Sequence, residues 1–284
     1  MPNSKRNVES PVEAVGREQV RPNRRLHAVI VGINVYKDPD IRDLEFAVAD
    51  ALSIHSCLHQ TFLPGELNTI LLLDEAATLT GVRAAIGEDL RMAVQPDDLV
   101  LLFFACHGSP ELQDPMKLPN RFLVMHDTRH DRLFSTGLNL ENEFNILLQR
   151  LRSNNIVVFI DSCFSGRAGG RTFDGPTLRQ VSERFRGSKR SLRKLNLGKG
   201  WVIITACDDS EVAFENSELS HGVFTHCLLQ VLLKDSTPDS TIPLTTLYNE
   251  IVIKVCELTN GEQTPSFNGQ MTSQRIPHLR QTIR

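Results

Sequence analysis

Four short, nearly continuous apolar runs constrain the fold of this chain more than any other feature of its sequence. They lie at residues 26–33, 98–105, 155–160 and 201–206. Runs that are apolar on both faces are typical of strands buried in the middle of a parallel sheet. Shorter apolar runs predict two further strands, at 70–73 and 121–125.

Between these runs, apolar residues recur at the spacing of amphipathic helices. The pattern predicts helices at about 43–62, at 79–90 behind a Thr78 cap, at 140–151, at 221–234 and at 243–258, the last with Pro243 in its first position. Strands that alternate with helices indicate an α/β fold with a mainly parallel sheet.

Two segments lack this pattern. Residues 1–24 are polar with little apolar content, which predicts a disordered tail. Residues 167–200 are rich in glycine, arginine and lysine. A loop of that length in a compact domain is usually functional or disordered.

Composition argues against several classes of function. The formal net charge of −3 gives no global basic field that would attract nucleic acid. No apolar run reaches the ~18–20 residues of a membrane span, and the polar N-terminus does not resemble a secretory signal. The six cysteines are scattered without a CxxC pair, which predicts reduced thiols. We therefore expect a cytoplasmic protein that binds neither nucleic acid nor membrane.

Two of the predicted buried strands end next to reactive residues. One is followed by His107 and another by Cys163. Because sites in open α/β sheets form beyond the carboxyl ends of the strands, neighbouring strands would bring these side chains together. A thiol beside an imidazole is the minimal set for nucleophilic acyl transfer. The nearby Gly108 and Gly166 would let a substrate backbone approach closely.

The residues alone leave a plainer interpretation open. A single cysteine after a strand is most often a small buried core residue, and a single histidine there is often structural. The paired placement favours chemistry without deciding for it.

The sequence around both positions resembles the caspase superfamily. Residues 103–109, FFACHGS, are similar to the strand and His-Gly motif of caspases, metacaspases and their bacterial relatives. Residues 160–166, IDSCFSG, are similar to the D-x-C-x-S-G motif of the metacaspase branch. Further matching segments lie at 47–51, 206–210, 221–225 and 263–265.

The resemblance implies a caspase-like three-layer sandwich, in which a mainly parallel six-stranded sheet has helices on both faces. It implies a cysteine endopeptidase in which Cys163 attacks the scissile carbonyl and His107 acts as acid and base. The backbone N–H groups of Gly108 and Cys163 would form the oxyanion hole.

The same resemblance implies a domain organisation. The peptidase domain would span 25–275, with a large-subunit-like part at 25–166, a basic glycine-rich linker at 167–200, a small-subunit-like part at 201–275 and a tail at 276–284.

Substrate preference also follows from the resemblance, which places Asp50 and Asp161 in the primary specificity pocket. Two carboxylates there would bind an ammonium or guanidinium group, and arginine can pair bidentately. Local roles stay open, since Asp50 could cap a helix and Asp161 could order the catalytic turn. We predict cleavage of proteins after Arg or Lys rather than Asp.

Activation is expected to involve the linker, where caspase-like proteins are often cut. We predict cleavage between about Arg184 and Lys199, either by the enzyme itself or by an upstream protease, with both fragments staying associated. A surface loop that any trypsin-like enzyme nicks is the plain alternative.

No cofactor or metal is expected. His126 and His130 have a spacing seen in zinc sites, but no matching second pair is evident. Asp208, Asp209 and Glu211 are interpreted as surface acidity, with a substrate rim or activation by calcium left open. Cys106 is predicted to be a buried thiol, with a redox or regulatory role left open.

Two rival functions remain at this stage. One is a catalytically silent caspase-like module that binds or scaffolds other proteins, and the other is a different cysteine-dependent acyl transferase or hydrolase. Retention of both His107 and Cys163 favours the active peptidase.

Overall fold

A computed structural model describes residues 25–111, 120–164, 171, 200–208, 211–234, 240–269 and 275–277. The predicted tail at 1–24 therefore lies outside the described residues. Of the predicted linker at 167–200, only Arg171 and Gly200 are described.

The centre of the molecule is a six-stranded sheet with the order β12-β8-β7-β3-β1-β2. Its strands are β1 (Leu26–Gly32), β2 (Leu67–Leu73), β3 (Leu99–Ala105), β7 (Ile156–Asp161), β8 (Trp201–Thr205) and β12 (Ser266–Gly269). Five strands run parallel, and β12 pairs antiparallel with β8. Every residue of β1, β3, β7 and β8 is buried, as expected for strands covered on both faces.

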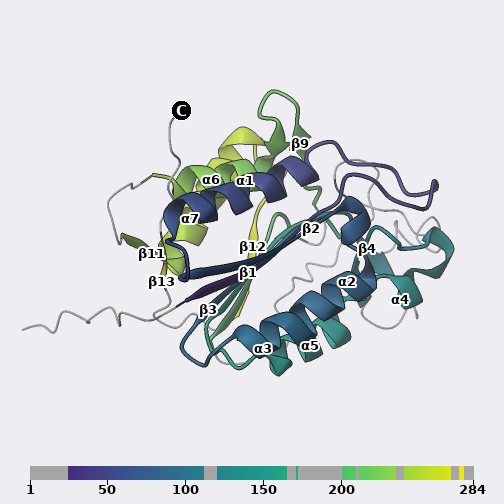
Figure 1. Ribbon diagram of the computed structural model, residues 1–284. Helices are drawn as coiled ribbons and strands as arrows, with labels where there is room; N and C mark the ends of the chain where they lie inside the picture. The colour runs from purple at the N-terminus through teal and green to yellow at the C-terminus, as the bar shows by residue number, and fades with distance from the viewer. Residues whose placement is uncertain are drawn as a thin grey trace, which may run out of the picture.

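Helices cover both faces of this sheet (Figure 1). One layer contains α1 (Ala47–Thr61), α6 (Val223–Leu232) and α7 (Leu244–Leu258), and the other contains α2 (Leu79–Ala84), α3 (Arg91–Ala93) and α5 (Asn145–Arg150). The short α4 (Leu133–Thr136) lies at the edge of the second layer. The predicted α/β architecture, with a mainly parallel six-stranded sheet and helices on both faces, is confirmed.

Three small sheets lie outside the central sheet in the described part of the chain. They are formed by β4 (Gly108–Glu111), β5 (Asn120–Leu123) and β6 (Leu138–Asn139), by β9 (Glu215–Asn216) and β10 (His221–Gly222), and by β11 (Thr241–Pro243) and β13 (Arg275–Pro277). Only β5 has a counterpart among the predicted strands. The pair β9–β10 borders the site described below.

Several predicted boundaries shift by a few residues. Thr78 caps α2 as predicted, since its Oγ1 accepts a hydrogen bond from the Gly81 N–H at 3.0 Å. Pro243 is the residue before α7 rather than its first residue, because its ψ of 137° is extended. The first long helix begins at Ala47, not at 43, because the residue before it, Phe46, has a φ of −120° and a ψ of 0°, outside the helical range.

Two of the predicted helices also contain π-helical turns, at Ala85–Leu90 and Leu140–Phe144. A π-helical turn keeps the same apolar stripe as an α-helix over a short stretch, so the sequence pattern does not distinguish them.

Candidate functional site

Sheet register brings the two predicted catalytic residues to one place. Strands β3 and β7 are parallel neighbours, and Ala105 pairs with Asp161 in their last rung. His107 and Cys163 each follow that rung by two residues. The two strand ends touch, since a Cβ added at Gly108 would lie 2.4 Å from the Cys163 carbonyl oxygen.

The imidazole of His107 is held on two sides. The backbone N–H of His107 donates to the Tyr36 hydroxyl at 2.8 Å. The Tyr36 ring stacks on the imidazole, with 5.2 Å between the ring centroids. Its Nε2–H donates to the Arg42 carbonyl at 2.7 Å. This contact leaves Nδ1 as the unprotonated nitrogen, buried and without a hydrogen-bond partner among the described residues.

Burial controls the proton affinity of this ring. Desolvation lowers the pKa of His107 to about 4, although the backbones of Arg42 and Arg171 act in the opposite direction. A neutral imidazole at neutral pH can accept a proton, which is what a base beside a thiol requires.

The thiol of Cys163 is buried, and its Sγ donates to the Glu211 carbonyl at 2.7 Å. Cys207 lies beside it, and the contact with Cys163 together with burial raises the pKa of the Cys207 thiol. In this arrangement the Cys163 proton is directed at a carbonyl of the loop after β8.

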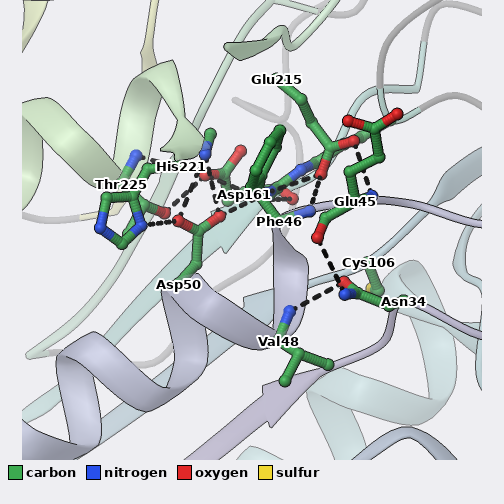
Figure 2. A network of polar contacts seen from close by, with 12 residues as sticks. Asn34, Glu45, Phe46, Val48, Asp50, Cys106, Asp161, Glu215, His221 and Thr225 are labelled. Atoms are coloured by element: carbon green, nitrogen blue, oxygen red, sulfur yellow. Dashed lines mark hydrogen bonds and ion pairs between the residues drawn. The ribbon is translucent and has the colours of Figure 1, made fainter. Parts of the chain in front are cut away.

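Three carboxylates converge next to these strand ends (Figure 2). Asp50 comes from α1, Asp161 is the last residue of β7, and Glu215 opens β9. Both aspartates are fully buried. The structure therefore brings together the two predicted pocket residues and adds a third acid that sequence analysis did not identify.

Neighbouring donors fix each of the two aspartates. His221 Nδ1–H donates to Asp50 Oδ1 at 2.7 Å, and the Gly222 N–H donates to the same carboxylate at 3.2 Å. Thr225 donates to Asp161 Oδ2 through its hydroxyl at 2.5 Å and its N–H at 3.2 Å. These donors come from β10 and the first turn of α6, so the part of the chain after β8 holds the carboxylates that α1 and β7 supply.

Glu215 ties the pocket to the chain before α1. Its carboxylate accepts from the Phe46 N–H at 2.9 Å and from the Glu45 N–H at 3.1 Å. Asn34 fastens the same stretch, because its amide donates to the Glu45 carbonyl and accepts from the Val48 N–H (Figure 2).

The side chain of Arg171 lies among these three carboxylates and is fully buried. Its Nη1 lies 3.0 Å from Asp161 Oδ2, its Nη2 lies 3.3 Å from Glu215 Oε1, and Nη2 also pairs with Asp50 Oδ2. Burial lowers the pKa of Arg171, but the three carboxylates raise it by more, so its pKa lies above the usual value. Burial raises the pKa of Asp161, Arg171 lowers it, and Asp50 raises it further.

The backbone of Arg171 is held as tightly as its side chain. Its carbonyl oxygen accepts from the Gly108 N–H at 3.1 Å and the Cys163 N–H at 3.3 Å, and its own N–H donates to the Ala213 carbonyl at 3.1 Å. The two N–H groups expected to form the oxyanion hole thus both point at one carbonyl oxygen.

The other residues considered from the sequence make contacts of a different kind. His126 Nδ1–H donates to the Val35 carbonyl at 2.7 Å, and no group of three or more His, Cys, Asp or Glu within the described ranges could hold a metal ion. Glu211 uses its carboxylate to accept from the Thr264 N–H at 2.6 Å. Cys106 contacts the Ser162 hydroxyl at 3.5 Å, and burial raises the pKa of its thiol to about 12.

Sequence reasoning missed Tyr36, Glu215 and the position of Arg171. Tyr36 and Glu215 carry no local signal, since each reaches the site from a segment far from the motifs. His221 and Arg171 had signals: the first lies in the matching segment 221–225, and the second directly follows the glycine pair 169–170 shortly after Cys163. No helix in the described part of the chain is both long and apolar enough to cross a membrane.

Comparison with known proteins identifies the fold. A family model described as a caspase domain matches residues 25–276. A Geobacter sulfurreducens protein of known crystal structure superposes with a TM-score of 0.61 at 19% identity, over 87% of this chain and 94% of the other. Caspase-1 of Spodoptera frugiperda superposes with a TM-score of 0.57 at 11% identity, over 98% of this chain and 100% of the other. A search of curated proteins found no match.

Proposed function

Because this chain belongs to the caspase domain family, we propose that it is a cysteine endopeptidase that cleaves proteins after Arg or Lys. Cys163 is the nucleophile and His107 is the acid and base. One observation carries the proposal: three carboxylates close around a guanidinium directly beside the ends of β3 and β7.

The proposed reaction begins when the Cys163 thiol turns from the Glu211 carbonyl towards His107. Nδ1 of His107 takes the thiol proton, because its other nitrogen is engaged with Arg42. The thiolate attacks the scissile carbonyl carbon, and the Gly108 and Cys163 N–H groups stabilise the oxyanion.

Collapse of this intermediate breaks the peptide bond. The imidazolium of His107 gives its proton to the leaving amine, and water then hydrolyses the thioester and restores the thiol. Each step is assigned to a side chain, a backbone group or solvent.

The charge of the pocket sets the substrate preference. Asp50, Asp161 and Glu215 favour a cation, and a P1 aspartate would add a fourth carboxylate to a water-poor site. Arginine should be preferred to lysine, because its planar fork reaches carboxylates on two sides while an ammonium reaches them from one point.

The rival function, a silent caspase-like binding module, shares the fold and predicts no turnover. The test uses fluorogenic peptides that are identical except for a terminal Arg, Lys, citrulline or Asp. Purified wild type should release the fluorophore from the Arg peptide fastest, and Cys163→Ala should release none while melting at a similar temperature.

Cys207→Ala is the matched control, since it removes a neighbouring thiol that has no proposed chemical role. It should retain activity. Equal turnover of the Arg peptide by wild type and Cys163→Ala would contradict the proposal, and so would a preference for the Asp peptide.

A further inference from the structure

We infer that Arg171 is the P1 residue of an internal substrate: the enzyme's first substrate is its own Arg171–Thr172 peptide bond, and Arg171 keeps the pocket closed until that bond is cut. This inference rests on the proposed function and adds to it the bond that is processed and the way the resting site is blocked.

The main-chain contacts of Arg171 are those that a cleavable residue needs. Its carbonyl oxygen lies on the N–H groups of Gly108 and Cys163, and its N–H is held by the Ala213 carbonyl. These contacts hold the Arg171 carbonyl against the backbone of Cys163, the proposed nucleophile. An arginine that served only to neutralise buried acids would need its side chain there, not its carbonyl.

The side chain makes the contacts expected of a bound substrate. Its guanidinium reaches Asp50, Asp161 and Glu215, and Arg171 is the largest of the fully buried side chains within the described ranges. Arg171 belongs to the linker that the sequence analysis predicts to be cleaved. Its guanidinium occupies the place proposed for the P1 arginine of a substrate.

The ion pairing is incomplete, as suits an occupant that leaves. Arg171 Nε and Asp161 Oδ1 are both buried without a hydrogen-bond partner in the described part of the chain. Permanent buried ion pairs are stabilising only when the remaining donors and acceptors are also satisfied. A pocket that must exchange occupants has no such requirement, because water or a substrate can complete it.

The reaction in cis follows the proposed steps. Sγ of Cys163 bonds to the Arg171 carbonyl carbon, the bond to the Thr172 nitrogen breaks, and His107 protonates that nitrogen. Water then converts the thioester into the Arg171 carboxylate and the free thiol. Because Sγ donates to the Glu211 carbonyl, the structure represents the state before proton transfer to His107.

Cleavage would open the site without separating the two parts. Strands β7 and β8 flank the cut segment and stay paired in the central sheet, with five residue pairs from Ile156–Trp201 to Ile160–Thr205. The new carboxylate of Arg171 would lie at the Gly108 and Cys163 N–H groups, and Arg171, no longer bonded to Thr172, could be displaced by a substrate.

This assignment places the cleavage site at a different position from the one predicted from the sequence. The sequence interpretation placed it between Arg184 and Lys199, which lies outside the described residues. Arg171 lies upstream of that range but within the same 167–200 linker.

The experiment incubates full-length wild type with Cys163→Ala, Arg171→Gln, Arg171→Lys and Arg167→Gln, and identifies new termini by mass spectrometry. Wild type and Arg167→Gln should yield a fragment that begins at Thr172, at a rate independent of protein concentration. Cys163→Ala should yield none. Arg171→Gln should be cut there about 100-fold more slowly or not at all, and Arg171→Lys should be intermediate.

Peptidase assays separate this inference from the proposed function. Wild type should hydrolyse the Arg peptide after a lag that matches release of the Thr172 fragment, whereas Arg171→Gln should show no lag. Wild type that hydrolyses the Arg peptide at once and never yields a Thr172 terminus would overturn the inference and leave the proposed function standing. Wild type that cleaves no peptide and no bond of its own would overturn the proposed function.

A synthetic peptide of residues 166–177 keeps the test valid if Arg171→Gln fails to fold. The peptide contains both Arg167 and Arg171, so cleavage after Arg167 serves as the internal control for cleavage after Arg171. Enzyme that cuts it after Arg171 supports the inference, and enzyme that cuts it only after Arg167 contradicts it.

Discussion

At the scale of single residues, the chemistry depends on how firmly His107 is oriented. Tyr36 binds its backbone N–H and stacks on its ring, and the Arg42 carbonyl fixes which nitrogen carries the proton. Within the described part of the chain, Tyr36 makes no hydrogen bond to the Cys163 thiol or to the three carboxylates, so in the proposed mechanism it would position His107 rather than act as a catalytic residue.

Replacing Tyr36 with Phe tests this role. The ring stack would remain, but the buried His107 N–H would lose its acceptor, which costs about 1–3 kcal/mol. We expect kcat for the Arg peptide to fall about tenfold with KM nearly unchanged. A variant that loses thermal stability with unchanged kcat would show that Tyr36 supports only the fold.

The pocket and the base should respond differently to pH. Burial and the neighbouring Asp50 raise the pKa of Asp161, and Arg171 and Thr225 lower it. Below its raised pKa Asp161 binds a proton and the pocket loses a negative charge. Burial keeps the pKa of His107 low, so the base stays neutral over the same range.

We therefore expect the preference for Arg over uncharged citrulline to fall as the pH drops from 7 towards 5. The ratio of kcat/KM for the two peptides reports this, because steps common to both substrates cancel. Asp161→Asn should show a small ratio that does not change with pH. A wild-type ratio that is constant across this range would argue against titration of the pocket.

At the scale of elements, the pocket is assembled by parts distant in the chain. Helix α1 and strand β7 supply the aspartates, while β9, β10 and α6 supply Glu215 and the donors that hold the aspartates. Gly222 forms one wall, since a Cβ there would lie 2.6 Å from Asp161 Oδ2 and 2.9 Å from Arg171 Nη2.

Gly222→Ala should therefore narrow the pocket without touching His107 or Cys163. We expect loss of Arg-peptide hydrolysis and of cleavage at Arg171, measured by fluorescence and mass spectrometry. Ser217→Ala, in the exposed turn between β9 and β10, is the matched control and should behave as wild type. A Gly222→Ala enzyme with normal kcat/KM would mean that Arg side chains bind elsewhere.

The four strands that are clearest in the sequence share one property, which is burial on both faces. Strands β1, β3, β7 and β8 appear as continuous apolar runs for that reason. Strand β12 was missed because it is a short antiparallel edge strand of Ser, Phe, Asn and Gly, with no run to detect. The pair β9–β10 is two residues long on each side and is held by tertiary contacts.

The residues of the site also differ in whether the local sequence reveals them. His107, Cys163, Asp50 and Asp161 follow from the motif resemblance. The roles of Glu215, Tyr36 and Arg171 depend on which segments lie side by side in space, and this information is absent from the local sequence.

At the scale of the whole molecule, one sheet joins the two parts on either side of the linker. In the proposed activation, cutting the linker would change the occupancy of the site, while the pairing of β7 with β8 would preserve the core. The division into large and small parts at 25–166 and 201–275 is proposed on this basis, as is activation of a zymogen by the enzyme itself or by an upstream protease.

The most direct test of the central claim is covalent labelling of the active site. Processed enzyme is treated with a peptidyl electrophile that ends in Arg, beside one that ends in Asp, and intact mass and peptide mapping locate the adduct. We predict one Arg-probe adduct per chain on Cys163, no reaction of Cys163→Ala, and much slower labelling by the Asp probe. Labelling of another cysteine, or equal labelling by both probes, would contradict the account of Cys163 as the nucleophile of an Arg-directed peptidase.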